Sequence, residues 1–198
     1  GGASPCYLLS SISCRRPAER IEFADGRTRD VWDWSFDVDR EAARRDVLEF
    51  GALEKREAAI LLDYRTGERV GKQPITPGTG ISVNVAELLR QARREGRTVV
   101  AVHNHSNGTP PSPQDVAVTV SWPGTLRETL VATPEGWHTL RPGPLSDPER
   151  PDRALIVTME MMQAEMDAGL LSEEQWQLEL KGFAVGGDIY HDYRRVSP

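Results

Sequence analysis

The stretch Thr98-Val99-Val100-Ala101-Val102-His103 decides the fold class of this chain. It is a short run of β-branched and small apolar residues, and such a run predicts a buried β-strand. After an irregular polar turn, Ser112-Pro113-Gln114-Asp115 has the serine, proline and acidic residue that begin many helices. We therefore expect a short helix over Pro113–Ser121. A buried strand that leads into a helix is typical of an α/β fold.

The residues upstream of this stretch extend the same pattern. Asp25-Gly26 predicts a hairpin turn within residues 20–34. Asp39 is placed to cap a helix over residues 40–55, and the charge-bounded apolar run 57–63 predicts a mostly buried strand. The order of these elements predicts a mixed β-sheet sandwiched by helices.

The residues on either side of the central strand add a helix and a hairpin. Asn84 and Glu87 have capping-box spacing and predict a helix that ends near Gly96. Residues 128–133 and 137–141 flank a turn and predict an antiparallel pair of strands.

A proline-rich segment precedes two predicted C-terminal helices. Apolar residues recur at helical spacing beyond it, and Ser172 with Gln175 is placed to cap the second helix. The apolar positions are Leu155, Met159, Met162, Met166 and Leu170, followed by Trp176, Leu180 and Phe183. We expect these Met-rich helices to pack against the main domain or against a partner protein. The predicted division is an extension with a hairpin (1–38), a core (39–142), a linker (143–152), and a helical hairpin with a tail (153–198).

Composition narrows the class of protein. The 198 residues are 38% hydrophobic and 27% charged, an ordinary globular balance. No run approaches the ~18 apolar residues of a membrane span, and the N-terminus lacks the layout of a signal peptide. Collagen, coiled coil, membrane protein and disulfide scaffold are excluded. The net charge of −6 argues against a nucleic-acid partner.

The first residues of the chain give an expectation about where the protein is located. The chain begins Gly-Gly-Ala without a methionine, so we expect a piece of a longer protein. That protein would be cytoplasmic, or the piece would be delivered or secreted as part of it. Cys6 and Cys14 could close a small loop in an oxidising compartment or stay as two buried thiols, and both alternatives remain open.

Two of the four histidines stand at the end of the predicted central strand, as His103 and His105. Residues i and i+2 of a strand face the same side, so both imidazoles can reach one ion. Asp115 lies on the first turn of the next helix, beside the end of the strand. Two imidazoles and one carboxylate, with a fourth position for water, are the ligand set of a catalytic zinc site. The alternative is a chance pair beside an ordinary helix cap. His138 and His191 lack ligand spacing and are expected to be ordinary surface or strand histidines.

The stretch 102–115 resembles the signature of the JAMM (JAB/MPN+) zinc metalloproteases, and its His-Asn-His opening resembles their bacterial RadC-like branch. The resemblance covers about 100 of the 198 residues. It implies the cytidine-deaminase-like JAB/MPN fold. The turn 106–111 is one residue shorter than is usual in that family, and Ser106 stands where the family has proline. We expect the shorter turn to leave Asp115 within reach of the metal, and to affect mainly the position of Ser112.

The resemblance also implies roles for individual residues. In that family a glutamate near the start of the preceding strand works with the reacting water, and Glu57 matches this position. Glu54 is the alternative. Ser112 would hydrogen-bond the water or the developing oxyanion, or would only cap the helix.

The function implied is zinc-dependent hydrolysis of a peptide or isopeptide bond, with Glu57 as the general base. The substrate would be a protein or peptide, and a ubiquitin-like tail is one that the resemblance suggests. The alternatives are a RadC-like protein associated with DNA metabolism and a JAB-fold binding module without turnover. Either the enzyme or the module could be the JAB domain of a bacterial polymorphic toxin or phage protein.

Overall fold

A computed structural model describes residues 19–22, 28–31, 36–70, 85–144, 146–147 and 149–196. The elements in chain order are β1 (Glu19–Glu22), β2 (Thr28–Val31), α1 (Phe36–Glu54), β3 (Ala59–Asp63), α2 (Ala86–Arg94), β4 (Val99–Asn104), α3 (Pro113–Ser121), β5 (Leu126–Thr133), β6 (Gly136–Pro142), α4 (Arg153–Asp167), α5 (Glu173–Gly186) and β7 (Ile189–Arg195). β1 and β2 pair as the predicted hairpin, but its turn, Asp25-Gly26, lies outside the described residues, as do Cys6 and Cys14.

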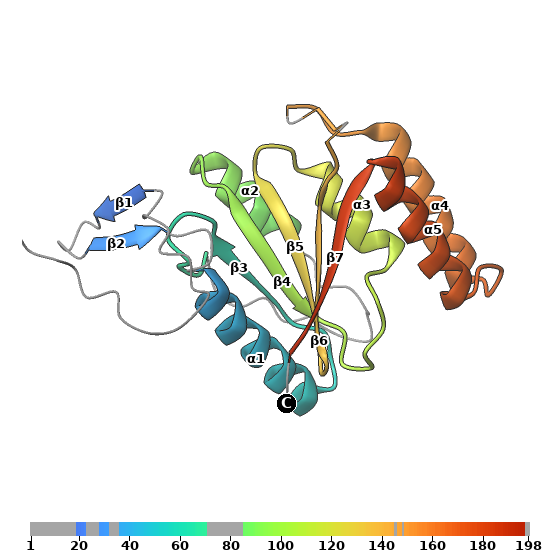
Figure 1. Cartoon of the computed structure of the whole chain (residues 1–198), viewed down its shortest axis with the longest axis horizontal. Helices are drawn as coiled ribbons and strands as arrows, with labels where there is room; N and C mark the ends of the chain where they lie inside the picture. Colours follow the sequence, from blue (N-terminus) through green and yellow to red (C-terminus); the bar gives the residue numbers. More distant parts are fainter. Residues whose placement is uncertain are drawn as a thin grey trace, which may run out of the picture.

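The centre of the fold is a five-stranded sheet with the order β3-β4-β5-β6-β7 (Figure 1). The pair β4–β5 is parallel, and each of the other neighbouring pairs is antiparallel. The sheet is therefore mixed, as predicted. The register aligns His103 of β4 with Ala59 of β3 and Val131 of β5, and Val131 in turn with His138 of β6. These side chains consequently face one side of the sheet.

Helices cover both faces of this sheet, which gives the layered α/β architecture that the sequence predicted. α1 packs on one face, and α2, α3 and α5 lie on the other, with α4 packed against α3 (Figure 1). The described helices include none that is both long and apolar enough to cross a membrane.

The first four residues of β4, Val99–Val102, are apolar because helices cover this strand on both sides. All six of its residues are buried. Val100 and Val102 belong to the cluster under α1, whereas Val99 and Ala101 belong to the cluster under α2. A strand covered on both faces needs no polar alternation, which explains its uninterrupted apolar run.

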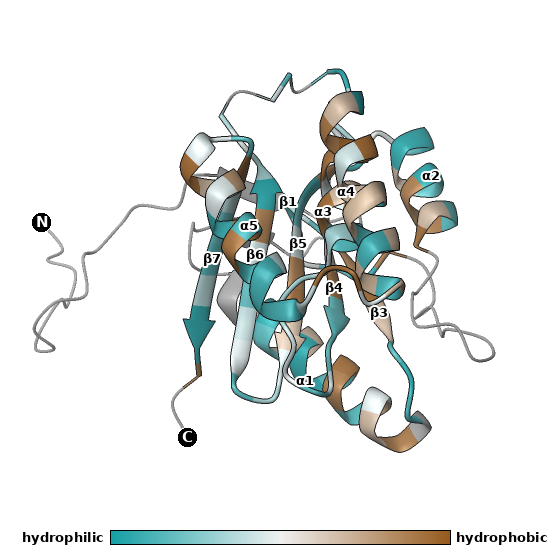
Figure 2. Cartoon of the chain, turned by 90° about the vertical axis from the view of Figure 1, so that its right-hand side faces the viewer, coloured by the Kyte–Doolittle hydropathy of each residue, from teal (hydrophilic) through white to brown (hydrophobic). Residues whose placement is uncertain are grey.

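The C-terminal helices pack as the apolar pattern predicted. Met159 and Trp176 are 0% and 1% exposed and join a cluster with α3 and the sheet. Hydrophobic and hydrophilic residues alternate along α4 and α5, as in helices that bury one side (Figure 2). Ser172 and Gln175 form the predicted capping box. Leu170, in contrast, lies beyond the end of α4 and is exposed.

Three local predictions differ from the structure. α1 begins at Phe36, so Asp39 lies within its first turn and does not precede it as a cap; acidic residues are favoured at both positions. α2 begins at Ala86 with Val85 at its cap, and no side chain caps it. The predicted cap Asn84 lies outside the described residues, and Glu87 pairs with Arg90 and Arg94. The third difference is β7, a strand that the sequence analysis did not predict.

Candidate metal centre

His103 and His105 project from the C-terminal end of β4. The backbone N–H of His105 donates to the carbonyl of Ala132 at 2.8 Å, so the strand end is held against β5. Asn104, between the two histidines, is 1% exposed and accepts a hydrogen bond from the Ala58 N–H at 2.7 Å. A Cβ at Gly51 would collide with this amide, so the glycine makes room for it. The strand end that bears the histidines is therefore fixed from both neighbouring sides.

Asp115 is held on the first turn of α3 by a capping box. The Ser112 hydroxyl accepts a hydrogen bond from the Asp115 N–H at 3.2 Å, and Asp115 Oδ2 accepts one from the Ser112 N–H at 2.6 Å. The Ser112 hydroxyl also donates to Asp115 Oδ2, at 2.8 Å. Ser112 thus caps the helix and orients the carboxylate.

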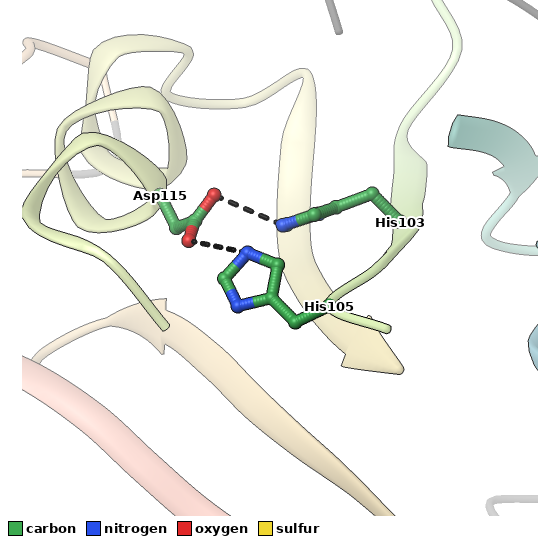
Figure 3. A group of neighbouring side chains, drawn as sticks. All are labelled: His103, His105 and Asp115. Carbon is green, nitrogen blue, oxygen red and sulfur yellow. Dashed lines mark ion pairs between the residues drawn. The ribbon is translucent and has the colours of Figure 1, made fainter. Parts of the chain in front are cut away.

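The three predicted ligands converge on one point (Figure 3). His103 Nε2 lies 3.0 Å from Asp115 Oδ1, and His105 Nε2 lies 3.5 Å from Asp115 Oδ2. One ligand atom from each residue lies within 4.8 Å of the others. Ligands 2.0–2.1 Å from a tetrahedral zinc are roughly 3.3 Å apart, so a small adjustment would let all three share one ion.

The chemistry of the donor atoms fits a metal. His105 Nδ1 faces the carbonyl oxygens of Thr109 and Pro110, each at 3.1 Å. Carbonyls only accept, which assigns the ring proton to Nδ1 and leaves the Nε2 lone pair facing Asp115. His103 Nε2 is buried and makes no hydrogen bond of acceptable geometry, although Asp115 Oδ1 is only 3.0 Å away. A buried nitrogen beside a carboxylate but not aligned with it is suited to a shared cation.

The electrostatics keep the carboxylate ionised and His105 neutral. Burial acts to raise the pKa of Asp115, but the nearby His103 and His105 outweigh it and hold that pKa well below its usual range. Burial lowers the pKa of His105. For His103, burial acts to lower the pKa, but the carboxylates of Asp115 and Glu57 together outweigh it and raise the pKa. An ionised carboxylate and a neutral imidazole are the ligand forms that a divalent metal requires.

Glu57 lies beside the three ligands and is not one of them. It precedes β3, and its Oε1 is 3.7 Å from His105 Nε2. Burial raises the pKa of Glu57 to about 7, with a smaller opposing effect from His103. The side chain of the alternative residue, Glu54, lies outside the described part of the structure.

Two cavities meet at this centre. One, of about 350 Å³, is lined by His103 and by apolar residues of α2, α3 and the sheet. The other, of about 440 Å³, is lined by His105, Ser112 and residues of α4 and α5. Glu57 and Asp115 line both cavities. The centre is therefore open to a ligand from two sides.

Several further residues complete the site, and the sequence analysis did not identify them. The carbonyls of Thr109 and Pro110 orient His105, and Asn104 pins the strand end. Asp167 and Glu173 line the larger cavity. No local sequence pattern predicts that side chains of α4 and α5 line this cavity, because only the packing of the two helices brings them near His105.

His138 and His191 form a separate pair on β6 and β7. His138 Nδ1 and His191 Nε2 are 3.1 Å apart, and the ring centroids are 5.4 Å apart. With the two nitrogens 3.1 Å apart, a centroid separation of 5.4 Å is about the largest possible, so the rings point at each other edge to edge and are not stacked. One N–H···N hydrogen bond joins them. They are strand histidines, as predicted.

No known protein family, curated protein or solved structure matches this chain.

Proposed function

We propose that this chain is a zinc-dependent hydrolase of the JAMM type, with the JAB/MPN fold, that cleaves a peptide or isopeptide bond. The observation that carries the proposal is the convergence of His103, His105 and Asp115, with Glu57 beside them, where two cavities meet. The resemblance of residues 102–115 to the JAMM signature supports the same conclusion.

The proposed roles combine the positions of these residues with the family resemblance. His103, His105 and Asp115 would hold zinc, which when bound supplies Lewis acidity that polarises a carbonyl and acidifies water. Glu57 would accept a proton from the attacking water and donate it to the nitrogen of the leaving amine as the C–N bond breaks. A carboxylate with a pKa of about 7 can both take and release a proton near neutral pH.

Ser112 has a positioning role in this proposal. Its hydroxyl donates to Asp115 Oδ2, so it orients the carboxylate ligand. The role in oxyanion binding that the family resemblance implies would require the hydroxyl to turn from Asp115 toward the substrate.

The test combines metal analysis with an assay of hydrolysis. Purified protein is stripped with a chelator, reloaded with zinc, and incubated with an internally quenched peptide library and with ubiquitin chains. We expect one zinc per chain and cleavage that disappears on stripping and returns on reloading. Absence of stoichiometric metal would contradict the metal centre. Bound zinc without cleavage of any substrate would favour the binding module instead.

A further inference from the structure

The C-terminal helices contact the segment that joins His105 to Asp115. Trp176 Nε1 of α5 donates to the carbonyl of Pro111 at 2.6 Å, and this indole is buried. The N–H of Gln114, on the first turn of α3, donates to Gln163 Oε1 of α4 at 3.3 Å. Pro111 and Gln114 lie within four residues of Asp115, so the position of the hairpin relative to the centre is fixed by the packing.

The larger cavity lies between this hairpin and the metal centre. One side presents Glu57, His105 and Asp115. The other side presents side chains of α4 and α5, namely Gln163, Met166, Asp167, Glu173 and Trp176. The hairpin, which lies outside the region that resembles the JAMM family, thus forms one wall of a cleft of about 440 Å³.

The charge of this wall is negative. Residues 153–186 carry six acidic side chains and two basic ones, a net −4 within the chain's −6. No Lys or Arg is among the described residues that line the cleft. Asp167 Oδ1 accepts a hydrogen bond from Gln163 Nε2 at 2.9 Å, and Glu173 Oε1 accepts one from Gln177 Nε2 at 3.4 Å, so both carboxylates accept from neutral amides. Asp115 and Glu57 would balance the two positive charges of a zinc ion. The negative charges of Asp167 and Glu173 would then remain without a balancing cation among the described residues of the cleft.

The opposite flank of the centre is apolar. Val85, Leu89, Val118 and Trp122 line the cavity of about 350 Å³ there. A chain lying across the centre would therefore meet an apolar surface on one side and carboxylates on the other. On the carboxylate side, the thioether of Met166 offers contact to an aliphatic stem, and Asp167 and Glu173 offer acceptors to a cationic end.

We propose that the α4–α5 wall selects a substrate that carries a lysine or arginine side chain next to the scissile bond. This inference rests on the proposed hydrolase function and names its substrate class. Because Asp167 and Glu173 are exposed, the preference is modest, roughly 3- to 10-fold, and decreases at high ionic strength.

The test measures binding without turnover. Dipeptide hydroxamates that differ in one side chain (lysine, norleucine or glutamate) are titrated calorimetrically into the zinc-loaded full-length chain at low salt. Norleucine matches the lysine stem without its charge. We expect lysine to bind 3- to 10-fold more tightly than norleucine, and glutamate to bind least tightly.

Two double variants separate the wall from the general charge of the hairpin. Asp167→Asn with Glu173→Gln should abolish the lysine preference and leave norleucine affinity and zinc content unchanged. Glu165→Gln with Glu179→Gln removes the same charge from the same two helices at exposed positions outside the cleft, and should keep the preference. Equal affinity for lysine and norleucine in the wild type, or equal loss in both double variants, would overturn the inference alone. Failure of every hydroxamate to bind would overturn the proposed function and this inference with it.

Discussion

His103 and His105 form one pair of imidazoles, and His138 and His191 form another on neighbouring strands of the same sheet. The rings of the first pair lie at 65°, with centroids 5.1 Å apart, and their Nε2 atoms approach one carboxylate. The rings of the second pair lie end to end, and their nitrogens bond to each other. Two imidazoles in proximity therefore do not suffice for a metal site.

The difference comes from the groups around each pair. Loop carbonyls hold the proton of His105 away from Asp115, and the α3 capping box aims the carboxylate at both rings. Within the described residues, the first pair belongs to the one group of three ligands that could hold a metal, and the second pair belongs to none. In the second pair, one imidazole instead donates a hydrogen bond to the other.

The largest expected effect tests this comparison directly. His103→Ala with His105→Ala should reduce bound zinc to background, because only one ligand remains. His138→Ala with His191→Ala should keep one zinc per chain. Metal analysis of both purified double variants, with circular dichroism as the control for folding, decides the matter. Zinc that follows the second pair would reverse the assignment.

Replacement of the proposed base should separate metal binding from catalysis. Glu57→Gln keeps the size of the side chain but cannot accept the proton, and we expect hydrolysis to fall by ~10²–10⁴ with zinc retained. Glu54→Gln is the matched control and should keep nearly full activity. Loss of zinc in Glu57→Gln would make this residue a ligand. Unchanged activity would move the base elsewhere.

The two pairs should also differ in how acid affects the metal-free protein. Burial, helped by His191, lowers the pKa of His138 from 6.5 to about 4. The unfolded chain then binds a proton that the folded chain refuses, so this pair lowers stability as pH falls from 6.5 to 4. The pKa of Asp115 is lowered from its ordinary value of 3.8. Its ionised carboxylate therefore stabilises the folded protein at pH values above 3.8, and this stabilisation is lost as the pH falls below 3.8.

Urea unfolding between pH 7 and pH 4 measures this difference. His138→Phe removes the titrating group, and its stability should depend less on pH than that of the wild type across this window. The difference between the two proteins isolates His138 from the opposite contribution of His103, whose pKa is raised. Parallel curves for the two proteins would show that His138 is not the group responsible.

The smallest effect compares two capping boxes. Ser112→Ala and Ser172→Ala should each cost about 0.5–2 kcal/mol of stability, because each removes a helix cap. Only Ser112→Ala should also weaken zinc binding, since its hydroxyl orients Asp115. Competition with a zinc-binding dye, run beside thermal unfolding, distinguishes the two variants. Equal zinc affinity in both would confine Ser112 to the role of a cap.

Local patterns predicted those elements whose burial is regular. The Val99–Val102 part of β4 is apolar because both faces of the strand are covered, and a serine, a proline and an aspartate mark the start of α3. β7 escaped prediction because it is an edge strand with one buried residue, Ile189, and polar residues over most of its length. Its partner β6, 47 residues away at the closest paired positions, provides the hydrogen bonds.

The sequence by itself determined the three candidate ligands, since the two-residue period of a strand and the first turn of a helix place them within a short stretch of chain. Tertiary structure alone decided that Glu57 would stand beside them, because β3 had to pair with β4 to bring it there. It also decided that α4 and α5 would form a wall of the cleft, since Trp176 reaches Pro111 across 65 residues. Contacts within one turn or strand follow from backbone periodicity, whereas contacts between distant segments depend on how whole elements bury their apolar faces.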